Sequence, residues 1–386
     1  MATSQPGTQA GAPPSAQSEL ASATETASQT STVNIGTRKS LLARIQADLV
    51  RDSLKEAWPS KSYEIHAMST MGDKNQIVAL HNFGAKSLWT HELEAGLLEG
   101  TLDLIVHCVK DMPTQLPPTL RLGAILKRED PRDCLVMKPS LAAQYTSLAS
   151  LPAGSIVGTS SVRRSAQIAS QYPHLKFADV RGNVGTRLSK LDDPAGEYSC
   201  LILAAAGLLR LGLADRITQY LDSRNGGMLY AVGQGALGIE VREGDDKVLD
   251  LLAPVAHLPT TLACLAERSL MRTLEGGCSV PIGVETEWGG NNNNNNNNKA
   301  VNTEDANNDN KRSSNADDET DDETLTMRAR VVSLDGSQAV NAASSAPVRT
   351  VVEADAFGRH VAQLLIEKGA GQILEKINLN RGIVDA

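Results

Sequence analysis

Residues 158–164 constrain the possible fold of this chain more than any other stretch. A short apolar run precedes them, and apolar residues at helical spacing follow them. Thr159, Ser160 and Ser161 are all residue types that favour the N-cap of a helix. The sequence therefore predicts a strand, a tight turn and a helix in succession, which is the repeating unit of α/β proteins.

Two arginines in the first turn of this predicted helix point to an anionic ligand. Arg163 and Arg164 stand where acidic residues are usually preferred, because the N-terminus of a helix carries partial positive charge. The mismatch suggests that a ligand supplies the negative charge. Arg181 and Arg187 flank two glycines shortly afterwards. Arginine suits bidentate binding of carboxylate or phosphate, although solvated surface arginines are the alternative.

The same strand–turn–helix pattern recurs along the chain. Apolar runs at residues 33–35, 102–108 and 200–204 predict further strands. Polar side chains follow each of them: Arg38 and Ser40, then Lys110 and Asp111, then Arg210. Open α/β sheets bind ligands at the carboxyl ends of their parallel strands, so these side chains are candidates for binding. For Lys110 and Asp111 the alternative is an exposed salt bridge of little energetic value.

Charge and composition indicate a cytoplasmic protein. Of the net charge of −8 on 386 residues, residues 299–325 carry −6 and residues 1–32 carry −2, so the rest of the chain can still form a locally positive cleft. No apolar run approaches the roughly 20 residues that span a membrane. The N-terminus lacks the basic and apolar regions of a secretory signal, and no Lys or Arg precedes Arg38, which argues against a mitochondrial transit peptide.

The five cysteines predict neither disulfides nor a zinc site. Their number is odd and no C-x-x-C pair occurs. Reduced thiols fit a cytosolic protein. No cluster of histidines or carboxylates accompanies the basic residues, so we expect no metal.

Composition also divides the chain. Residues 1–32, rich in small and polar types, should form a disordered tail. A polar segment at 128–133 is a candidate crossing between domains, and the apolar run at 231–241 is a candidate return crossing. The literal G-x-G-x-x-G at 233–238 lacks a strand before it and a helix after it, so we interpret it as accidental. The asparagine-rich, acidic tract at about 290–324 should be a disordered insertion.

Seven stretches together resemble the hydroxymethylbilane synthase, or porphobilinogen deaminase, family. They follow the family's order over almost all of residues 33–386 apart from the insertion: 36–40, 106–113, 128–133, 158–164, 181–187, 231–240 and 274–283. The resemblance implies an α/β fold of three domains. The first two resemble the lobes of a type II periplasmic-binding protein, and the third is a smaller α+β domain. The implied boundaries are 33–130 with about 230–252, then 131–229, then 255–386.

The resemblance also implies an activity. Such enzymes condense four porphobilinogen molecules head to tail, release ammonia and free the linear tetrapyrrole hydroxymethylbilane for haem biosynthesis. They carry a dipyrromethane cofactor on a cysteine thioether, and the match places it on Cys278. Cys134, Cys200 and Cys264 fit small buried hydrophobes instead. The implied partner is a small-molecule substrate, with neither nucleic acid nor membrane, and the chain is expected to be a monomer.

Residue-by-residue matches to the family assign the candidate site. Each pyrrole ring adds an acetate and a propionate, so many basic side chains are needed. Loss of ammonia leaves an electron-poor azafulvene whose pyrrole N–H a carboxylate stabilises, and Asp111 is the catalytic candidate. The cofactor-binding candidates are Cys278, Lys110, Ser160, Ser161, Arg163, Arg164, Arg187 and Lys86. The substrate-binding candidates are Arg38, Ser40, Gln46, Arg181 and Arg210.

Two positions depart from the family pattern, and two rival functions stay open. Cys108 stands where the family usually has Ser and can pack similarly, whereas Asn82 replaces a frequent Lys and gives Lys86 more weight. One rival is a non-catalytic two-lobed binding protein for an anionic solute, which needs neither Asp111 nor Cys278. The other is a phosphate-handling transferase that uses the helix N-termini, for which the chain has no nucleotide or metal motif.

Overall fold

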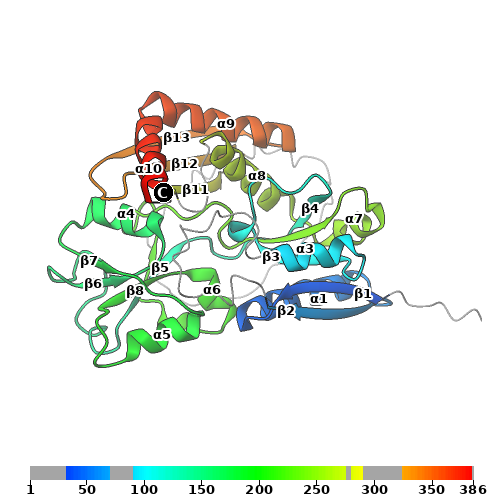
Figure 1. The fold of residues 1–386 in the computed structure, drawn as a ribbon, viewed down its shortest axis with the longest axis horizontal. Coiled ribbons are helices and arrows are strands. Elements are labelled where there is room, and N and C mark those ends of the chain that lie inside the picture. The colour runs from blue at the N-terminus through cyan, green and yellow to red at the C-terminus, as the bar shows by residue number, and fades with distance from the viewer. Residues whose placement is uncertain (1–31, 70–89, 275–279, 290–323, 385–386) are drawn as a thin grey trace, which may run out of the picture.

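The structure is a computed structural model that describes residues 32–69, 90–274, 280–289 and 324–384. These residues form three β-sheets with helices packed around them, which confirms the predicted α/β fold (Figure 1). Thr32 and Thr324, the last residues of the two segments expected to be disordered, lie in strands. The predictions for Asn82, Lys86, Cys278 and for disorder in the rest of those segments concern residues outside the described ranges.

The first lobe is built on a five-stranded sheet in the order β2-β1-β3-β10-β4. β1 is parallel to β2 and β3, whereas β10 is antiparallel to β3 and β4. Ala47, Val50 and Leu54 recur at helical spacing, so α1 buries one face. The elements are β1 (Thr32–Arg38), α1 (Leu41–Ala57), β2 (Ser62–Met68), α3 (His91–Leu98), β3 (Leu104–Cys108), the 3₁₀ turn η2 (Val109–Asp111), β4 (Leu120–Ile125), β10 (Leu237–Arg242), α7 (Asp246–Leu252) and η4 (Ala253–Val255).

The second lobe repeats this topology in the order β7-β6-β8-β5-β9. β6 is parallel to β7 and β8, and β5 is antiparallel to β8 and β9. The lobes lie next to each other, with α6 of the second near α1 of the first (Figure 1). The elements are β5 (Asp133–Met137), β6 (Ile156–Gly158), α4 (Val162–Gln171), β7 (Lys176–Ala178), α5 (Val184–Asp192), β8 (Cys200–Ala204), α6 (Ala205–Arg210), η3 (Ala214–Arg216) and β9 (Gln219–Leu221).

Two crossings join the lobes. The chain leaves the first lobe after β4 and returns to it with β10, which confirms both predicted crossings. The crossings pair through the backbone, with Glu129 N–H donating to the Gly235 carbonyl over 3.2 Å. Gly233 and Gly235 have φ of 70° and 85°, and a Cβ on Gly235 would lie 2.4 Å from the Glu129 oxygen. The glycines thus allow two chain segments to approach closely.

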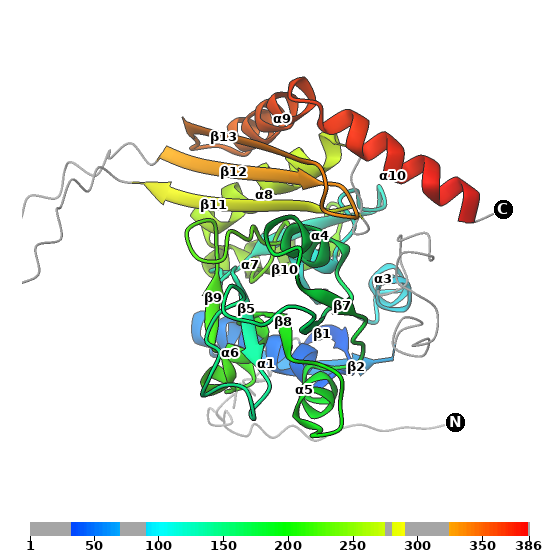
Figure 2. The ribbon, with the colours of Figure 1, turned by 90° about the vertical axis from the view of Figure 1, so that its left-hand side faces the viewer.

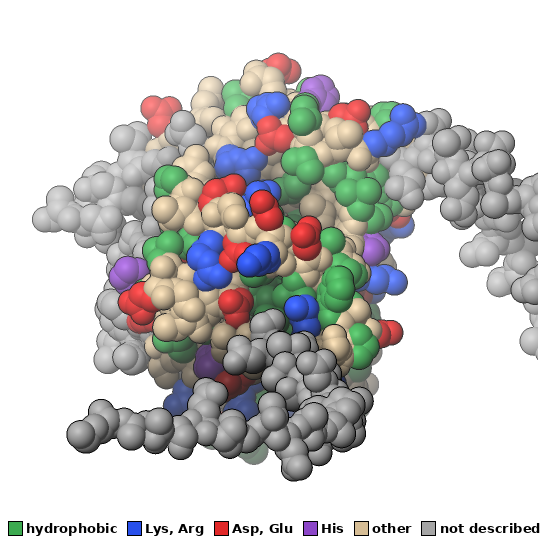
Figure 3. Space-filling view, turned by 90° about the vertical axis from the view of Figure 1, so that its right-hand side faces the viewer, with side chains coloured by type: hydrophobic (Ala, Val, Ile, Leu, Met, Phe, Trp, Pro, Cys, Tyr) green, Lys and Arg blue, Asp and Glu red, His purple; other side chains and the backbone are tan. Residues whose placement is uncertain are grey.

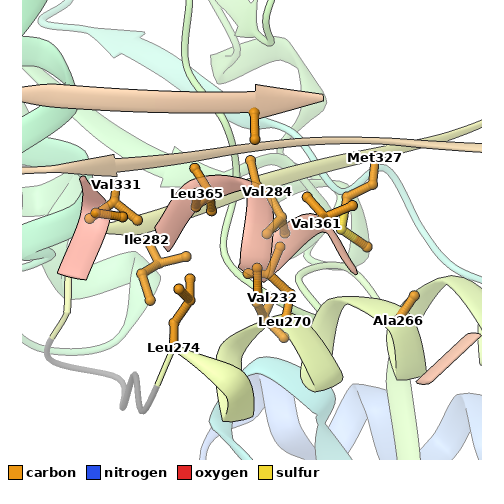
Figure 4. Close-up of a cluster of buried hydrophobic side chains, with 14 of the residues drawn as sticks. Val232, Ala266, Leu270, Leu274, Ile282, Val284, Met327, Val331, Val361 and Leu365 are labelled. Atoms are coloured by element: carbon orange, nitrogen blue, oxygen red, sulfur yellow. The ribbon is translucent and has the colours of Figure 1, made fainter. Parts of the chain in front are cut away.

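The third sheet lies across the lobes and is antiparallel in the order β11-β12-β13 (Figure 2). Leu270, Leu274, Val284, Met327 and Val361 are among the side chains that meet between the sheet and its helices (Figure 4). This apolar core joins segments far apart in the sequence. The elements are α8 (Leu258–Thr273), β11 (Ile282–Gly289), β12 (Thr324–Val332), β13 (Ala339–Pro347), α9 (Val351–Glu367) and α10 (Ala370–Val384).

Acidic and basic side chains are interspersed on the face shown in Figure 3. Within the described ranges, no single helix is long and apolar enough to span a membrane. Only α7 with η4, taken together with α8, reaches that length and composition, and this pair is bent by 112°.

Candidate active site

The candidate site lies where the lobes meet, at the carboxyl ends of their parallel strands. In the first lobe, β3 ends in the η2 turn, which leaves Lys110 half-buried and Asp111 exposed. In the second lobe, β6 and β7 lead directly into α4 and α5. The strand–turn–helix arrangement expected around residues 158–164 is therefore confirmed, and α4 carries Arg163 and Arg164 in its first turn.

Lys110 interacts with charged groups of both lobes and does not form a simple salt bridge within its own turn. Its Nζ lies 3.5 Å from Oε1 of Gln234, on the return crossing. Burial lowers the pKa of Lys110, and the nearby Arg164 guanidinium lowers it further, whereas the Asp111 and Asp133 carboxylates act in the opposite direction. Charged groups of the second lobe therefore influence the pKa of Lys110 in the first lobe.

Asp133 neutralises both arginines of α4. Arg163 Nη1 donates to Oδ2 over 2.7 Å, and Arg164 donates to Oδ1 from Nε and Nη2 over 3.0 and 2.7 Å. Burial by itself raises the pKa of Asp133, but the two guanidinium groups outweigh it and hold that pKa well below its ordinary value. The sequence suggests that a ligand supplies the compensating negative charge, and the structure shows that Asp133, a buried strand residue, supplies one carboxylate. Binding of the cofactor by Arg163 and Arg164 stays a prediction.

The helices α4 and α5 both begin without a side-chain cap. Neither Ser161 nor Asn183, their N-cap residues, accepts a backbone hydrogen bond with its side chain. Ser160 Oγ donates to the Val180 carbonyl and so ties the two strand–helix turns together. Arg187 Nε donates to the Gly182 carbonyl over 2.8 Å, while Arg181 Nε lies 4.0 Å from an Asp179 oxygen.

Arg187 is electrostatically part of the same cluster. Burial lowers its pKa, and the charges of Arg164 and Arg181 lower it further, whereas Asp179 and Asp111 oppose that shift. A buried group of basic side chains with depressed pKa values is stabilised by an added anion. The arrangement therefore suits a ligand with carboxylate groups.

The remaining candidates lie around the first lobe and the crossings. Buried Gln46 contacts Sγ of Cys108, 3.2 Å from its Nε2. Burial raises the pKa of the Cys108 thiol, so the residue behaves as a packed thiol. Ser40 caps α1 by accepting the Ala43 N–H, and half-buried Arg38 ends β1. The structure thus gives Ser40 a helix-capping contact in addition to its predicted substrate role.

Arg210 points to the crossings. Its Nη2 donates to the Gly235 carbonyl over 2.7 Å, and burial lowers its pKa. It also lines a pocket of about 700 Å³ together with α1 side chains such as Ser53 and Glu56, and neither Lys110 nor Asp111 lines that pocket.

Sequence reasoning missed two buried residues at the centre of the site. Asp133 closes the polar segment 128–133, whose unusual density of charge was the available signal. Gln234 stands between two glycines in the return crossing, where only the glycine pattern drew notice. It donates from Nε2 to the Pro131 carbonyl and to Asp133 Oδ1, over 2.8 and 2.9 Å. Neither residue belongs to a recognisable ligand-binding motif. Both side chains bond to other groups of the protein.

The fold and the site define a two-lobed α/β protein in which the Lys110–Asp111 turn of one lobe lies near Arg164 and Arg187 of the other. Two family models match the chain: "Porphobilinogen deaminase, dipyromethane cofactor binding domain" over residues 33–250 and "Porphobilinogen deaminase, C-terminal domain" over residues 261–307. The chain belongs to the porphobilinogen deaminase family.

Curated relatives agree over nearly the whole chain. A porphobilinogen deaminase of Neurospora crassa is 48% identical over 357 residues, which cover 92% of this chain and 96% of that protein. The porphobilinogen deaminase of Saccharomyces cerevisiae is 47% identical over 355 residues, covering 91% and 98%. Among solved structures, substrate-binding domain 2 of Lactococcus lactis GlnP in its open conformation is 11% identical with a TM-score of 0.37, over 61% of this chain and 93% of that chain.

Proposed function

We propose that this chain condenses four porphobilinogen molecules head to tail into hydroxymethylbilane, with release of ammonia, and that Asp111 is its catalytic carboxylate. Family membership and the match to the dipyrromethane cofactor-binding domain support the activity. One observation carries the assignment of residues: the only carboxylate of the η2 turn, Asp111, lies within electrostatic reach of Lys110 and of Arg187 from the other lobe.

Asp111 acts on the charge that develops during loss of ammonia. When ammonia leaves the aminomethyl group of porphobilinogen, the methylene carbon stays on the pyrrole ring, which becomes electron-poor, and the ring N–H becomes more acidic. A carboxylate beside that N–H stabilises the positive charge and accepts or returns the proton. Its position in a short turn at the end of a buried strand keeps the carboxylate in place.

The basic residues hold the carboxylates of substrate and cofactor. When bound, the dipyrromethane cofactor would supply the nucleophilic terminal pyrrole carbon at which the chain of rings begins. Its acetate and propionate groups fit the donor set observed here, because Arg187 and Lys110 are incompletely neutralised and the helix N-termini at Ser161 and Asn183 lack side-chain caps. Arg163, Arg164, Ser160 and Lys86 complete the proposed cofactor contacts, and Arg38, Ser40, Gln46, Arg181 and Arg210 the proposed substrate contacts.

Cys278 is the proposed point of covalent attachment. Two buried residues, Leu274 and Val280, anchor the chain on either side of it in the core of the third sheet. Arg268 of α8 donates to the carbonyls of Pro113 and Thr114, over 2.6 and 3.2 Å. The helix that leads toward Cys278 is thus bonded to the loop that follows Asp111, which supports a cofactor tethered near that carboxylate.

The proposal extends to organisation and surroundings. We assign residues 33–130 with about 230–252, residues 131–229 and residues 255–386 to three domains, which the three sheets support. Porphobilinogen is the proposed partner, with neither nucleic acid nor membrane. The four described cysteines are free, as in the cytoplasm. We expect a monomer, which light scattering in solution checks.

The variant Asp111→Asn tests the catalytic assignment. Replacing the carboxylate by an amide keeps the shape but removes the charge and the proton acceptor, so kcat should fall by roughly 100-fold or more. Steady-state assays with porphobilinogen measure the loss, and thermal unfolding together with intact mass checks that fold and cofactor persist. The matched control is Asp215→Asn, an exposed aspartate in the 3₁₀ turn η3, which should keep normal turnover. Normal turnover of Asp111→Asn would contradict the role.

A further inference from the structure

Gln234 is a buried amide at the junction of the two lobes. It lies on the return crossing between two glycines and is 1% exposed. Its backbone carbonyl accepts a hydrogen bond from Arg128 Nε over 2.8 Å, so the main chain at this point is fixed to the other crossing. A polar side chain this deeply buried is stable only when its hydrogen-bonding groups are satisfied.

The orientation of the Gln234 amide is determined by its neighbours. Nε2 lies 2.8 Å from the Pro131 carbonyl and 2.9 Å from Asp133 Oδ1, and both neighbours are acceptors only. The NH₂ group must therefore face them, since an amide oxygen there would meet two oxygens. As a consequence, Oε1 faces the first lobe, where it lies 3.5 Å from Lys110 Nζ.

We infer that Gln234 is a positioning residue that orients the Lys110 ammonium toward the proposed cofactor-binding site and links it to the Asp133–arginine cluster of the second lobe. The inference rests on the proposed role of the Lys110–Asp111 turn and deepens it. Lys110 has four bonds of rotational freedom, and an acceptor on one side restricts where its charge can lie. The same amide contacts Asp133, which holds Arg163 and Arg164. One side chain therefore couples cations of both lobes.

A packing role and a positioning role make different predictions for Lys110. The charged groups that influence its ammonium are Asp111 and Cys108 on its own segment, Arg164 on α4 and Asp133 on β5. Gln234→Met keeps length and volume but removes the acceptor, so the pKa of Lys110 should fall by about 0.5 to 1 unit. Gln234→Glu places a carboxylate beside the ammonium, so the same pKa should rise.

Competitive acetylation of the holoenzyme with acetic anhydride, across a pH series, measures this pKa, and peptide mass mapping reports modification of Lys110. The control is Gln167→Met, because Gln167 is an equally buried residue whose side-chain amide bonds only to the backbone of Leu229 in the described structure. It should leave the titration of Lys110 unchanged. Opposite shifts of the Lys110 pKa in the two Gln234 variants support the inference. A Lys110 pKa that is unchanged in both variants overturns it, whatever the activity of Asp111→Asn.

Turnover gives a second test. Gln234→Met should lower kcat by roughly 10-fold. If Gln234 acts through Lys110, adding Gln234→Met to Lys110→Met should bring no further loss. Independent losses that multiply would show that Gln234 only packs the crossing, and would contradict the inference.

Discussion

Asp133 shows how one buried residue can set the properties of a site that it does not enter. It is nearly fully buried, yet it remains charged, because Arg163 and Arg164 donate to both of its oxygens. Without it, two guanidinium groups would be buried with backbone carbonyls as acceptors but no counter-ion, a state that costs several kcal/mol. The three residues together keep one net positive charge at the start of α4.

Asp133→Asn should therefore destabilise the fold by about 3–5 kcal/mol near neutral pH. The folded-state pKa of Asp133 is depressed, so its contribution is fully present above the ordinary aspartate pKa of about 3.9 and is lost as pH falls below that value. Urea unfolding of both proteins across pH measures the difference. A difference in the free energy of unfolding that persists unchanged below about pH 3, or that is absent at pH 7, would contradict this account.

Single residues were also the hardest features to predict. Asp111, Lys110 and the arginine stretches stand out because charged types follow apolar strands. Asp133 and Gln234 give no such signal, because their partners are 30 and more residues away and become neighbours only when β5 pairs with β8 and the crossings meet.

At the scale of elements, α8 holds the crossings to the third sheet. Glu267 of α8 is fully buried and accepts from Arg128 over 2.6 and 3.1 Å, from the Gly233 N–H over 2.7 Å and from Thr286 Oγ1 over 2.6 Å. Burial lowers the pKa of Arg128, but the Glu267 carboxylate outweighs it and raises that pKa well above its ordinary value. The Arg128 guanidinium also lies 5.0 Å from the centre of the Tyr230 ring.

Glu267→Gln removes the charge from this junction and leaves Arg128 buried without a counter-ion. The free energy of unfolding should fall by about 3–5 kcal/mol. Glu243→Gln, which breaks an exposed pair with Arg121, serves as the control and should change it by less than about 1 kcal/mol. Chemical denaturation of both variants makes the comparison, and equal small losses would show that the junction is not a stabilising unit.

The helices and strands matched the sequence predictions closely where the spacing of apolar residues agreed with the turn and capping residues that bound them. β8 has the predicted bounds, and α4 begins beside its predicted cap. The antiparallel insertion of β10 between β3 and β4 could not be predicted, because the other strands of its sheet precede both crossings in the sequence. Such strand pairing depends on tertiary contacts, which no local sequence pattern encodes.

At the scale of the whole molecule, two lobes of one topology share two crossings, and a third sheet is bonded to both crossings through α8. The resemblance of seven stretches predicted the family, which the comparisons confirm over nearly the entire chain. It did not predict the internal carboxylate that neutralises α4. The family pattern records which residue types recur, whereas charge compensation depends on distances in the folded chain.

The central claim is that this chain carries its own dipyrromethane on Cys278 and extends it with porphobilinogen. Intact mass of the denatured protein, followed by peptide mapping, tests it most directly. The account predicts an added mass of two condensed porphobilinogen units located on the Cys278 peptide, and further additions of one unit each after brief exposure to porphobilinogen. An active enzyme with an unmodified Cys278 peptide, or with the added mass on another residue, would contradict it.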